Sequence, residues 1–199
     1  MMPSRIMLRD FWAPLVAAWS EVFEQIEVVD VARADFFANE ADALVSPANS
    51  FGITDGGLDL AIRTELGHHV QKRVQERILA ENHGELPVGS AFIVSTEHER
   101  WPYLVVAPTM RVPEPAGHAL NAYLAFRAAL LAVADFNSAE PTPRITSVVV
   151  PGFCTGIGGM GAKRCAVQMR MAYDQVNKPA QIPSFGAIHR LHHELRSAG

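Results

Sequence analysis

The stretch between residues 42 and 66 constrains the fold more than any other part of this sequence. Its apolar residues 43–45 have strand character, residues 46–49 (SPAN) form a polar turn, and a glycine pair at 56–57 precedes a helical pattern that begins at Leu58. Backbone N–H groups can approach an anion closely only where no Cβ intervenes, and a helix N-terminus adds the positive end of its dipole. The stretch is therefore typical of a cradle for a phosphate or a nucleotide.

Two polar side chains give this stretch a capacity for chemistry. Asn commonly hydrogen bonds its own backbone in turns, and the Asn49 amide is also suited to bind ribose hydroxyls, so both roles are open. Asp59 falls in the first turn of the predicted helix, where the helix dipole stabilises a carboxylate. The same position directs that carboxylate toward a ligand on the glycine loop, where it can act as a base. Asp55 precedes the glycines and is expected to shape the turn.

A second glycine-rich segment follows an apolar run in the last third of the chain. Residues 145–150 read ITSVVV, which is typical of a strand covered on both faces, and residues 151–161 read PGFCTGIGGMG. Loop flexibility explains single glycines. Two such loops at one edge of a sheet are better explained as two walls around a diphosphate.

Together these segments resemble the macrodomain family, whose members bind ADP-ribose. SPAN stands where the family has NAAN, and the ten-residue spacing of Asn49 and Asp59 is that of the hydrolytic branch. The segment 148–161 looks like the family's strand and S-T-G-I/V-x-G diphosphate loop. Asp35 lies fourteen residues before Asn49, where the family places an aspartate that holds the adenine amino group. The three matches cover about residues 28–176 and occur in the family's order.

The resemblance implies a set of site residues. Asn49 and Asp59 are the implied catalytic residues, and no metal or cofactor is implied. The second loop departs from the family, because Gly158 and Met160 stand where aromatic residues usually pack against the distal ribose, and Phe51 or Phe153 is a candidate substitute. The implied ligand-binding residues are Asp35, Phe51, Gly56, Gly57, Phe153, Cys154, Thr155, Gly156, Ile157, Gly158 and Gly159.

The resemblance also implies a function. The protein is expected to bind ADP-ribose or ADP-ribosylated protein and to hydrolyse an ADP-ribose derivative. The candidate substrates are mono-ADP-ribose on protein carboxylates, O-acetyl-ADP-ribose and ADP-ribose 1″-phosphate. One alternative is a reader module that binds ADP-ribose without turnover. Another, outside the family, is an α/β phosphatase that acts on a different nucleotide.

Composition limits the class of protein further. The 199 residues are 49% hydrophobic and 19% charged, which is ordinary for a globular domain, and the net charge of −4 gives no support for nucleic-acid binding. The apolar residues 11–19 are too few to span a bilayer, so no membrane segment is predicted. Three histidines of the C-terminal tail are expected at the surface rather than at a metal. Two cysteines without a CxxC spacing favour a reducing cytoplasm.

Strand and helix patterns alternate along the chain. Strands are predicted at residues 26–31, 43–46, 90–96, 104–107 and 145–150; helices are predicted at 14–25, 58–79 (with a break near Gly67), 120–136 and 162–176, and a proline-containing loop at 140–144. This order indicates an α/β fold, a three-layer α/β/α sandwich around a central mixed sheet, with ligands at the carboxyl ends of the strands. Residues 1–199 are predicted to form one domain. Its core spans about residues 26–178, with the N-terminal helix and the poorly patterned C-terminal tail as extensions.

Overall fold

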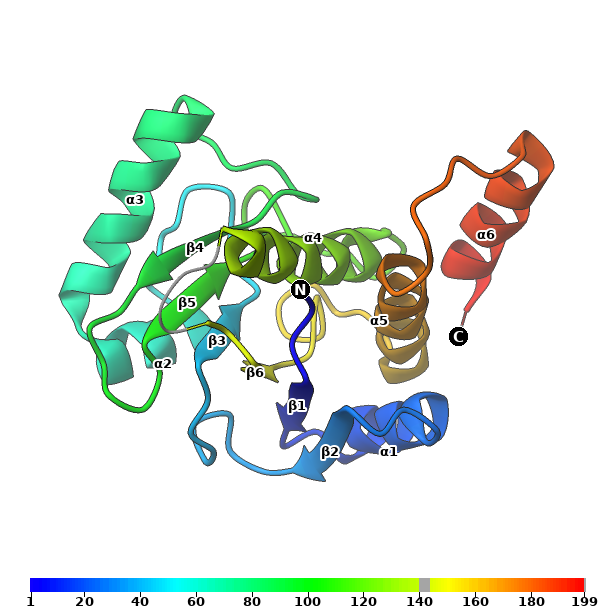
Figure 1. Cartoon of the computed structure of the whole chain (residues 1–199), viewed down its shortest axis with the longest axis horizontal. Helices are drawn as coiled ribbons and strands as arrows, with labels where there is room; N and C mark the ends of the chain where they lie inside the picture. Colours follow the sequence, from blue (N-terminus) through cyan, green and yellow to red (C-terminus); the bar gives the residue numbers. More distant parts are fainter. Residues whose placement is uncertain (140–143, 199) are drawn as a thin grey trace.

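The structure is a computed structural model that describes residues 1–139 and 144–198. A six-stranded sheet forms its centre, and helices cover both faces (Figure 1). The strands are β1 (Arg5–Asp10), β2 (Val29–Arg33), β3 (Ala43–Ser46), β4 (Phe92–Ser95), β5 (Tyr103–Val106) and β6 (Ser147–Val150). The helices are α1 (Ala13–Phe23), α2 (Gly57–Leu66), α3 (His68–Asn82), α4 (Asn121–Ser138), α5 (Ala162–Val176) and α6 (Phe185–Ser197).

The sheet is mixed, with the strand order β2-β1-β6-β3-β5-β4. All neighbouring strands are parallel except β4, which pairs with β5 in the antiparallel sense. The predicted fold class, a three-layer α/β/α sandwich with a central mixed sheet, is confirmed. Five parallel strands therefore place their carboxyl ends at one edge of the sheet, where the following loops can meet.

Side chains of successive strand residues point to opposite faces of the sheet, and both faces are buried. In β1, Ile6 and Leu8 pack in a core beneath α1, α4 and α5, whereas Met7 packs on the other face beneath α2 and α3. In β6, Val148 and Val150 face the first layer and Val149 faces the second. The near-continuous apolar runs of the central strands follow from this two-sided burial.

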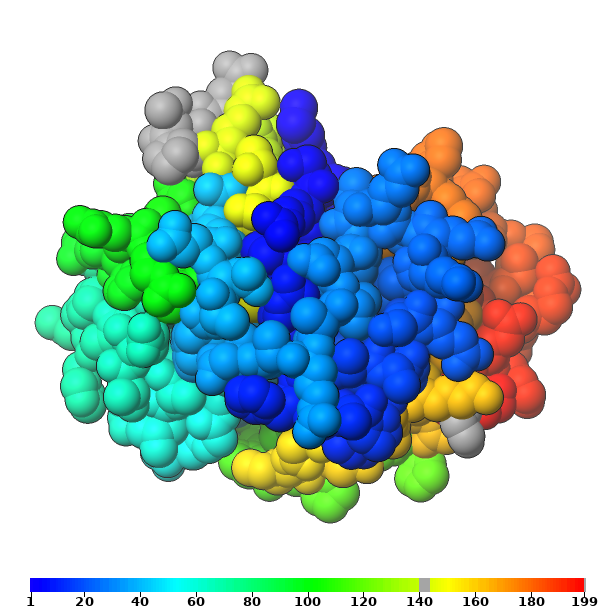
Figure 2. Space-filling view, turned by 90° about the horizontal axis from the view of Figure 1, so that it is seen from below, coloured from blue at the N-terminus to red at the C-terminus, as the bar shows by residue number. Residues whose placement is uncertain are grey.

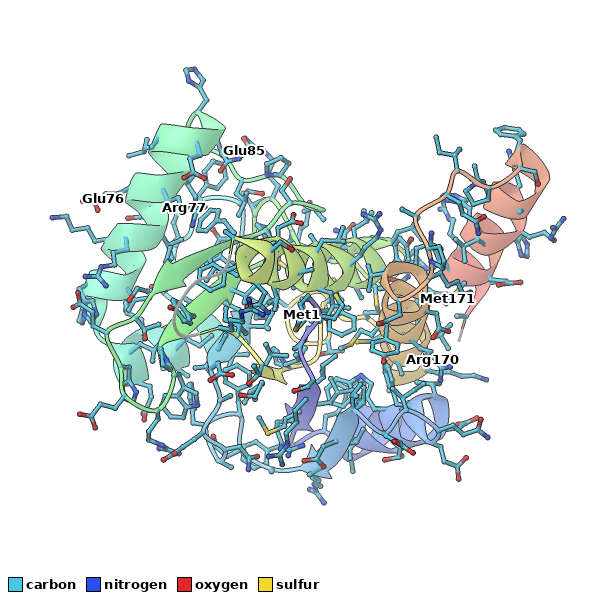
Figure 3. The ribbon with its side chains drawn as sticks, in the orientation of Figure 1. Met1, Glu76, Arg77, Glu85, Arg170 and Met171 are labelled. Carbon is cyan, nitrogen blue, oxygen red and sulfur yellow. The ribbon has the colours of Figure 1, made fainter. Side chains whose placement is uncertain are left out.

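The N-terminal segment supplies a strand that the sequence pattern did not predict. β1 pairs with both β2 and β6, so a segment predicted to be an extension lies within the sheet. Arg9 interrupts the apolar pattern of β1. Its side chain is nevertheless only 4% exposed, and its guanidinium donates to Asp30 Oδ2 and Asn39 Oδ1, at 2.7 Å each. Met1 lies beside α4 (Figure 3), and the amide of Asn137 donates to its carbonyl oxygen at 3.0 Å.

The C-terminal tail also differs from its prediction, because residues 185–197 form helix α6. The Ser184 hydroxyl caps this helix by accepting the N–H of Ala187 at 3.3 Å. α6 lies outermost in the molecule, beside α5 (Figure 1), and Leu195 is its one fully buried side chain. The Gln168 amide of α5 donates to the Leu195 carbonyl oxygen at 3.0 Å, which ties the end of α6 to the core.

The predicted break near Gly67 is confirmed. Gly67 has a φ of 95°, a value that glycine adopts without strain, and it separates α2 from α3. The predicted loop at 140–144 lies, except for Arg144, outside the described residues. None of the helices in the described ranges is long and apolar enough to cross a membrane.

Candidate functional site

A cavity of about 360 Å³ lies where the parallel strands end. Its walls come from Asp10 at the end of β1, from Trp12, and from residues that follow β3 (47–49, 53 and 55–59), β5 (109, 110 and 113) and β6 (151, 152 and 154–158). In Figure 2 the loop after β6 (gold) and the segment after β5 (light green) emerge along one edge of the molecule. This is the usual ligand position in an open α/β sheet.

Nine of the thirteen predicted site residues line this one cavity. They come from two segments that are far apart in the sequence and that meet because β3 and β6 are neighbours in the sheet. These nine residues are Asn49, Gly56, Gly57, Asp59, Cys154, Thr155, Gly156, Ile157 and Gly158. Asp35, Phe51, Phe153 and Gly159 are not among the residues that line it.

The Asn49 side chain braces its own loop. Its Oδ1 accepts the N–H groups of Phe51 and Ile53 at 3.1 and 3.2 Å, and its Nδ2 donates to the Ile53 carbonyl oxygen at 2.6 Å. The turn-forming role is therefore present in the structure. A primary amide carries two N–H donors, so one donor remains for a ligand in the cavity.

Asp59 lies in the first turn of α2, and a hydrogen bond from a residue of the sheet holds its carboxyl group. The hydroxyl of Ser46, a 4% exposed residue at the end of β3, donates to Asp59 Oδ1 at 2.6 Å. Burial raises the pKa of Asp59 from 3.8 to about 6; the negative charge of Asp55 adds to this rise, and the Ser46 hydrogen bond opposes it. The Asp59 carboxyl group is thus ionised at neutral pH, but the pH at which it takes up a proton is only slightly lower. A general base needs a pKa in this range.

The loop after β6 lines the cavity with residues 151, 152 and 154–158. The loop is closed by the N–H of Met160 donating to the Cys154 carbonyl oxygen at 2.9 Å, and by the N–H of Ala116 donating to the Gly158 carbonyl oxygen at 2.8 Å. In the described parts of the chain no group accepts the N–H groups of residues 155–158. Unused N–H groups in a tight loop form a concave site for an anion.

The absence of an aromatic residue at Gly158 has a steric cause. A Cβ at this position would lie 2.5 Å from the Cys154 carbonyl oxygen, which is too close for any side chain. Met160, at the second such position, is 1% exposed and belongs to the core. Cys154 itself adopts a φ of 62°, and burial raises the pKa of its thiol to about 12, so the thiol is not a nucleophile at neutral pH.

Neither proposed aromatic substitute points into the cavity. Phe153 is fully buried and packs against Phe126 at a centroid distance of 5.8 Å, because the chain turns inward directly after β6. Phe51 packs instead beneath the guanidinium of Arg111, 5.1 Å from the ring centroid. The prediction that either side chain rebuilds the ribose wall is corrected by these contacts.

Asp35 lies beyond β2 with an exposed carboxylate, whose Oδ1 accepts the N–H of Phe37 at 2.7 Å. Two cavity residues were missed, Asp10 and Trp12, because Asp10 ends the unpredicted strand β1 and Trp12 follows shortly after it. Asp10 Oδ1 accepts the N–H of Trp12 at 2.8 Å, and the Trp12 indole is 40% exposed at the cavity wall. The signal available in the sequence was an acidic residue and aromatic residues shortly after the apolar residues 6–8, separated from them by Arg9.

No three His, Cys, Asp or Glu side chains gather closely enough to hold a metal ion in the part of the chain that the structure describes. The imidazole of His189 in α6 packs edge-on against Phe185 at 4.3 Å. The site is therefore best described by its backbone N–H groups and its carboxylates.

Comparison with known proteins gives consistent matches. The sequence model of a family described as Macro domain matches residues 45–169. An uncharacterised protein of Pyrobaculum aerophilum is 30% identical over 168 residues, which cover 83% of this chain and 82% of that protein. The macrodomain of Mycobacterium tuberculosis DarG superposes with a TM-score of 0.58 at 18% identity, over 73% of this chain and 89% of that one. An Oceanobacillus iheyensis macrodomain mutant solved with ADPR gives a TM-score of 0.56 at 22% identity, over 70% and 74% of the two chains.

Proposed function

Because this chain belongs to the macrodomain family, we propose that it binds ADP-ribose and hydrolyses ADP-ribose derivatives. The observation that carries the proposal is the cavity between two glycine loops, with Asp59 at one end. Membership of the family removes the alternative of an unrelated α/β phosphatase. The two cysteines are free and buried, which is compatible with the reducing cytoplasm that we propose as its location.

The order of the strands suggests how ADP-ribose lies in the cavity. Adjacent strands are about 4.8 Å apart, so the three intervals from β1 to β5 span about 14 Å, enough for an extended dinucleotide-like ligand. The diphosphate would lie over the N–H groups of residues 155–158, because these follow β6 in the middle of the row. The adenine would lie toward Trp12 and Asp35, after β1 and β2. The distal ribose would then reach Asn49 and Asp59.

This placement gives each polar residue a chemical role. The remaining N–H donor of Asn49 would hold a hydroxyl of the distal ribose. The Asp59 carboxylate would accept a proton from a water molecule that attacks C1″. Asp35 would accept from the adenine amino group, which selects adenine over a 6-oxo purine. Trp12 would add an aromatic surface for the base, since stacking on an aromatic ring is worth about 1–3 kcal/mol.

A binding module without turnover is the second candidate, and the observation that favours it is the open wall at Gly158. The aromatic residue that packs on the distal ribose in relatives is absent here for a steric reason. A ribose held less firmly would be recognised but oriented poorly for attack by water.

Calorimetric titration with ADP-ribose, AMP and NAD, followed by a turnover assay, tests the proposal. ADP-ribose at 100 times its dissociation constant should stabilise the protein by about 2.7 kcal/mol. In the turnover assay on mono-ADP-ribosylated protein, Asp59→Ala should lower the rate by about 10²–10⁴-fold, with a much smaller effect on ADP-ribose affinity. Glu65→Ala, an exposed change on the same helix, is the control and should leave both unchanged.

Three outcomes separate the candidates. Tight ADP-ribose binding with no turnover identifies a reader. Equal turnover by the parent and Asp59→Ala assigns Asp59 to helix capping alone. No binding at millimolar ADP-ribose overturns the proposed function.

A further inference from the structure

Three carboxylates line the cavity, and the described part of the chain contributes no cationic side chain to it. Asp10, Asp55 and Asp59 contribute to its walls, and no Lys or Arg lines it within residues 1–139 and 144–198. The Arg111 guanidinium, on the segment after β5 that lines the cavity, instead binds Glu85 through two hydrogen bonds of 2.8 and 3.0 Å. A ligand in this cavity therefore obtains its positive partners from backbone N–H groups alone.

Two of the three carboxylates lie at the same end of the cavity, on either side of the glycine pair that begins α2. Asp55 acts electrostatically on Asp59 and disfavours its ionised form. Arg63, one turn further along α2, is turned away and donates to Gln71 Oε1 at 3.2 Å. The positive end of the α2 dipole amounts to about half an elementary charge, which does not compensate two carboxylates. This end, where C1″ of the distal ribose would lie, is negatively charged above pH 6.

We infer that the substrate carries a positively charged group at C1″, namely ADP-ribose linked to the guanidino nitrogen of an arginine side chain, and that ADP-ribose 1″-phosphate is rejected. The inference rests on the proposed function and narrows its substrate class. A guanidinium is planar, keeps its charge at all relevant pH values and donates several N–H groups, which suits a site with two carboxylates. A 1″-phosphate would add like charge at the same place.

The hydrolysis of such a substrate balances without any further reactant. Water forms the new C1″–O bond as the C1″–N bond breaks, and the bonding electron pair leaves with the guanidine nitrogen. The proton that water loses to Asp59 passes to that nitrogen, so arginine departs as its guanidinium. Asp59 returns to its ionised form.

Three ligands that share the ADP-ribose moiety test the inference at pH 8 and low salt. They are free ADP-ribose, ADP-ribose 1″-phosphate, and ADP-ribose linked to the guanidino group of capped arginine; capping removes the charges of the amino acid backbone. Dissociation constants are measured by calorimetry on the full chain with Asp59 intact, at a temperature low enough that turnover during a titration is negligible. The phosphate should bind roughly tenfold more weakly than free ADP-ribose, and the arginine conjugate roughly tenfold more tightly.

Asp55→Asn separates charge from shape. It removes one of the two negative charges at an exposed position. The affinities of the 1″-phosphate and of the arginine conjugate, each divided by the affinity of free ADP-ribose, should therefore both move toward one by about threefold or more. Glu65→Gln is the matched control: it removes the same charge from an exposed position of α2 outside the cavity and should leave both ratios unchanged.

The inference is overturned if the 1″-phosphate binds as tightly as ADP-ribose, or if Asp55→Asn leaves both ratios as they are. In either case ADP-ribose binding, and with it the proposed function, still stands. Failure of free ADP-ribose to bind overturns the function and the inference together.

Discussion

Replacing Asp59 by asparagine should make the protein more stable at neutral pH. Burial holds the pKa of this carboxyl group at about 6, whereas in the unfolded chain its ordinary value is 3.8. Between these values the folded protein binds the proton more strongly, so the free energy of unfolding falls as the pH rises from about 4 to 6. The difference between the two pKa values corresponds to about 3 kcal/mol. Asn has the same shape and can still accept the Ser46 hydrogen bond, but it has no charge to desolvate.

Urea unfolding of the parent and Asp59→Asn from pH 3.5 to 7.5 measures this effect. The indoles of Trp19 and Trp101 are fully buried, so their fluorescence reports unfolding. The gain in stability from the substitution should be about 3 kcal/mol larger at pH 7.5 than at pH 3.5, with the change centred between pH 4 and 6. Glu65→Gln serves as the control and should show no comparable change. A gain that is independent of pH, or that grows toward acid, would refute the assignment of a desolvated carboxyl at Asp59.

Three further substitutions probe the adenine end, the β6 loop and the last helix. Asp35→Ala should weaken ADP-ribose binding by about 1.5–3 kcal/mol and leave IDP-ribose binding nearly unchanged in calorimetry; equal losses for both ligands would show a structural role. Gly158→Ala forces the loop away from the Cys154 carbonyl and should cost about 1–3 kcal/mol of stability, whereas Gly161→Ala, where a Cβ meets nothing within 4 Å, should be tolerated in thermal unfolding. Leu195→Ala should speed hydrogen exchange in α6 without affecting exchange in β6; uniform acceleration would contradict the view that α6 docks through this side chain.

The sequence predicts the parts of this protein in which local pattern and packing agree. Some features were predicted because few other local structures tolerate their residues. They are the glycines of the two loops, the glycine at the helix break (Gly67), and the apolar runs of the buried strands β3 and β6. In β1 the local pattern and the packing disagree, because three apolar residues are followed by Arg9, whose burial depends on Asp30 and Asn39. Partners that are distant in the sequence cannot be read from a local pattern.

The same limit explains the errors within the site. The sequence placed Asn49, Asp59 and most of the β6 loop in one cavity, because the ends of parallel strands meet at one edge. It did not reveal that Phe153 turns into the core and that Phe51 packs beneath Arg111, since the direction of a loop side chain depends on its neighbours in space. Asp10 and Trp12 were lost together with the strand that positions them.

The position of β1 has a consequence for how the chain folds as it is synthesised. β1 leaves the ribosome before the other strands of this sheet, yet one of its two neighbours in the sheet is β6, with Arg5 opposite Ser147. Pairing between such distant segments is slow, because a long loop must close before the contact is made. The edge of β1 that will receive β6 stays unpaired until most of the chain has emerged, and an open apolar strand edge attracts other chains. A stalled or truncated chain that ends before β6 should therefore aggregate or occupy a chaperone.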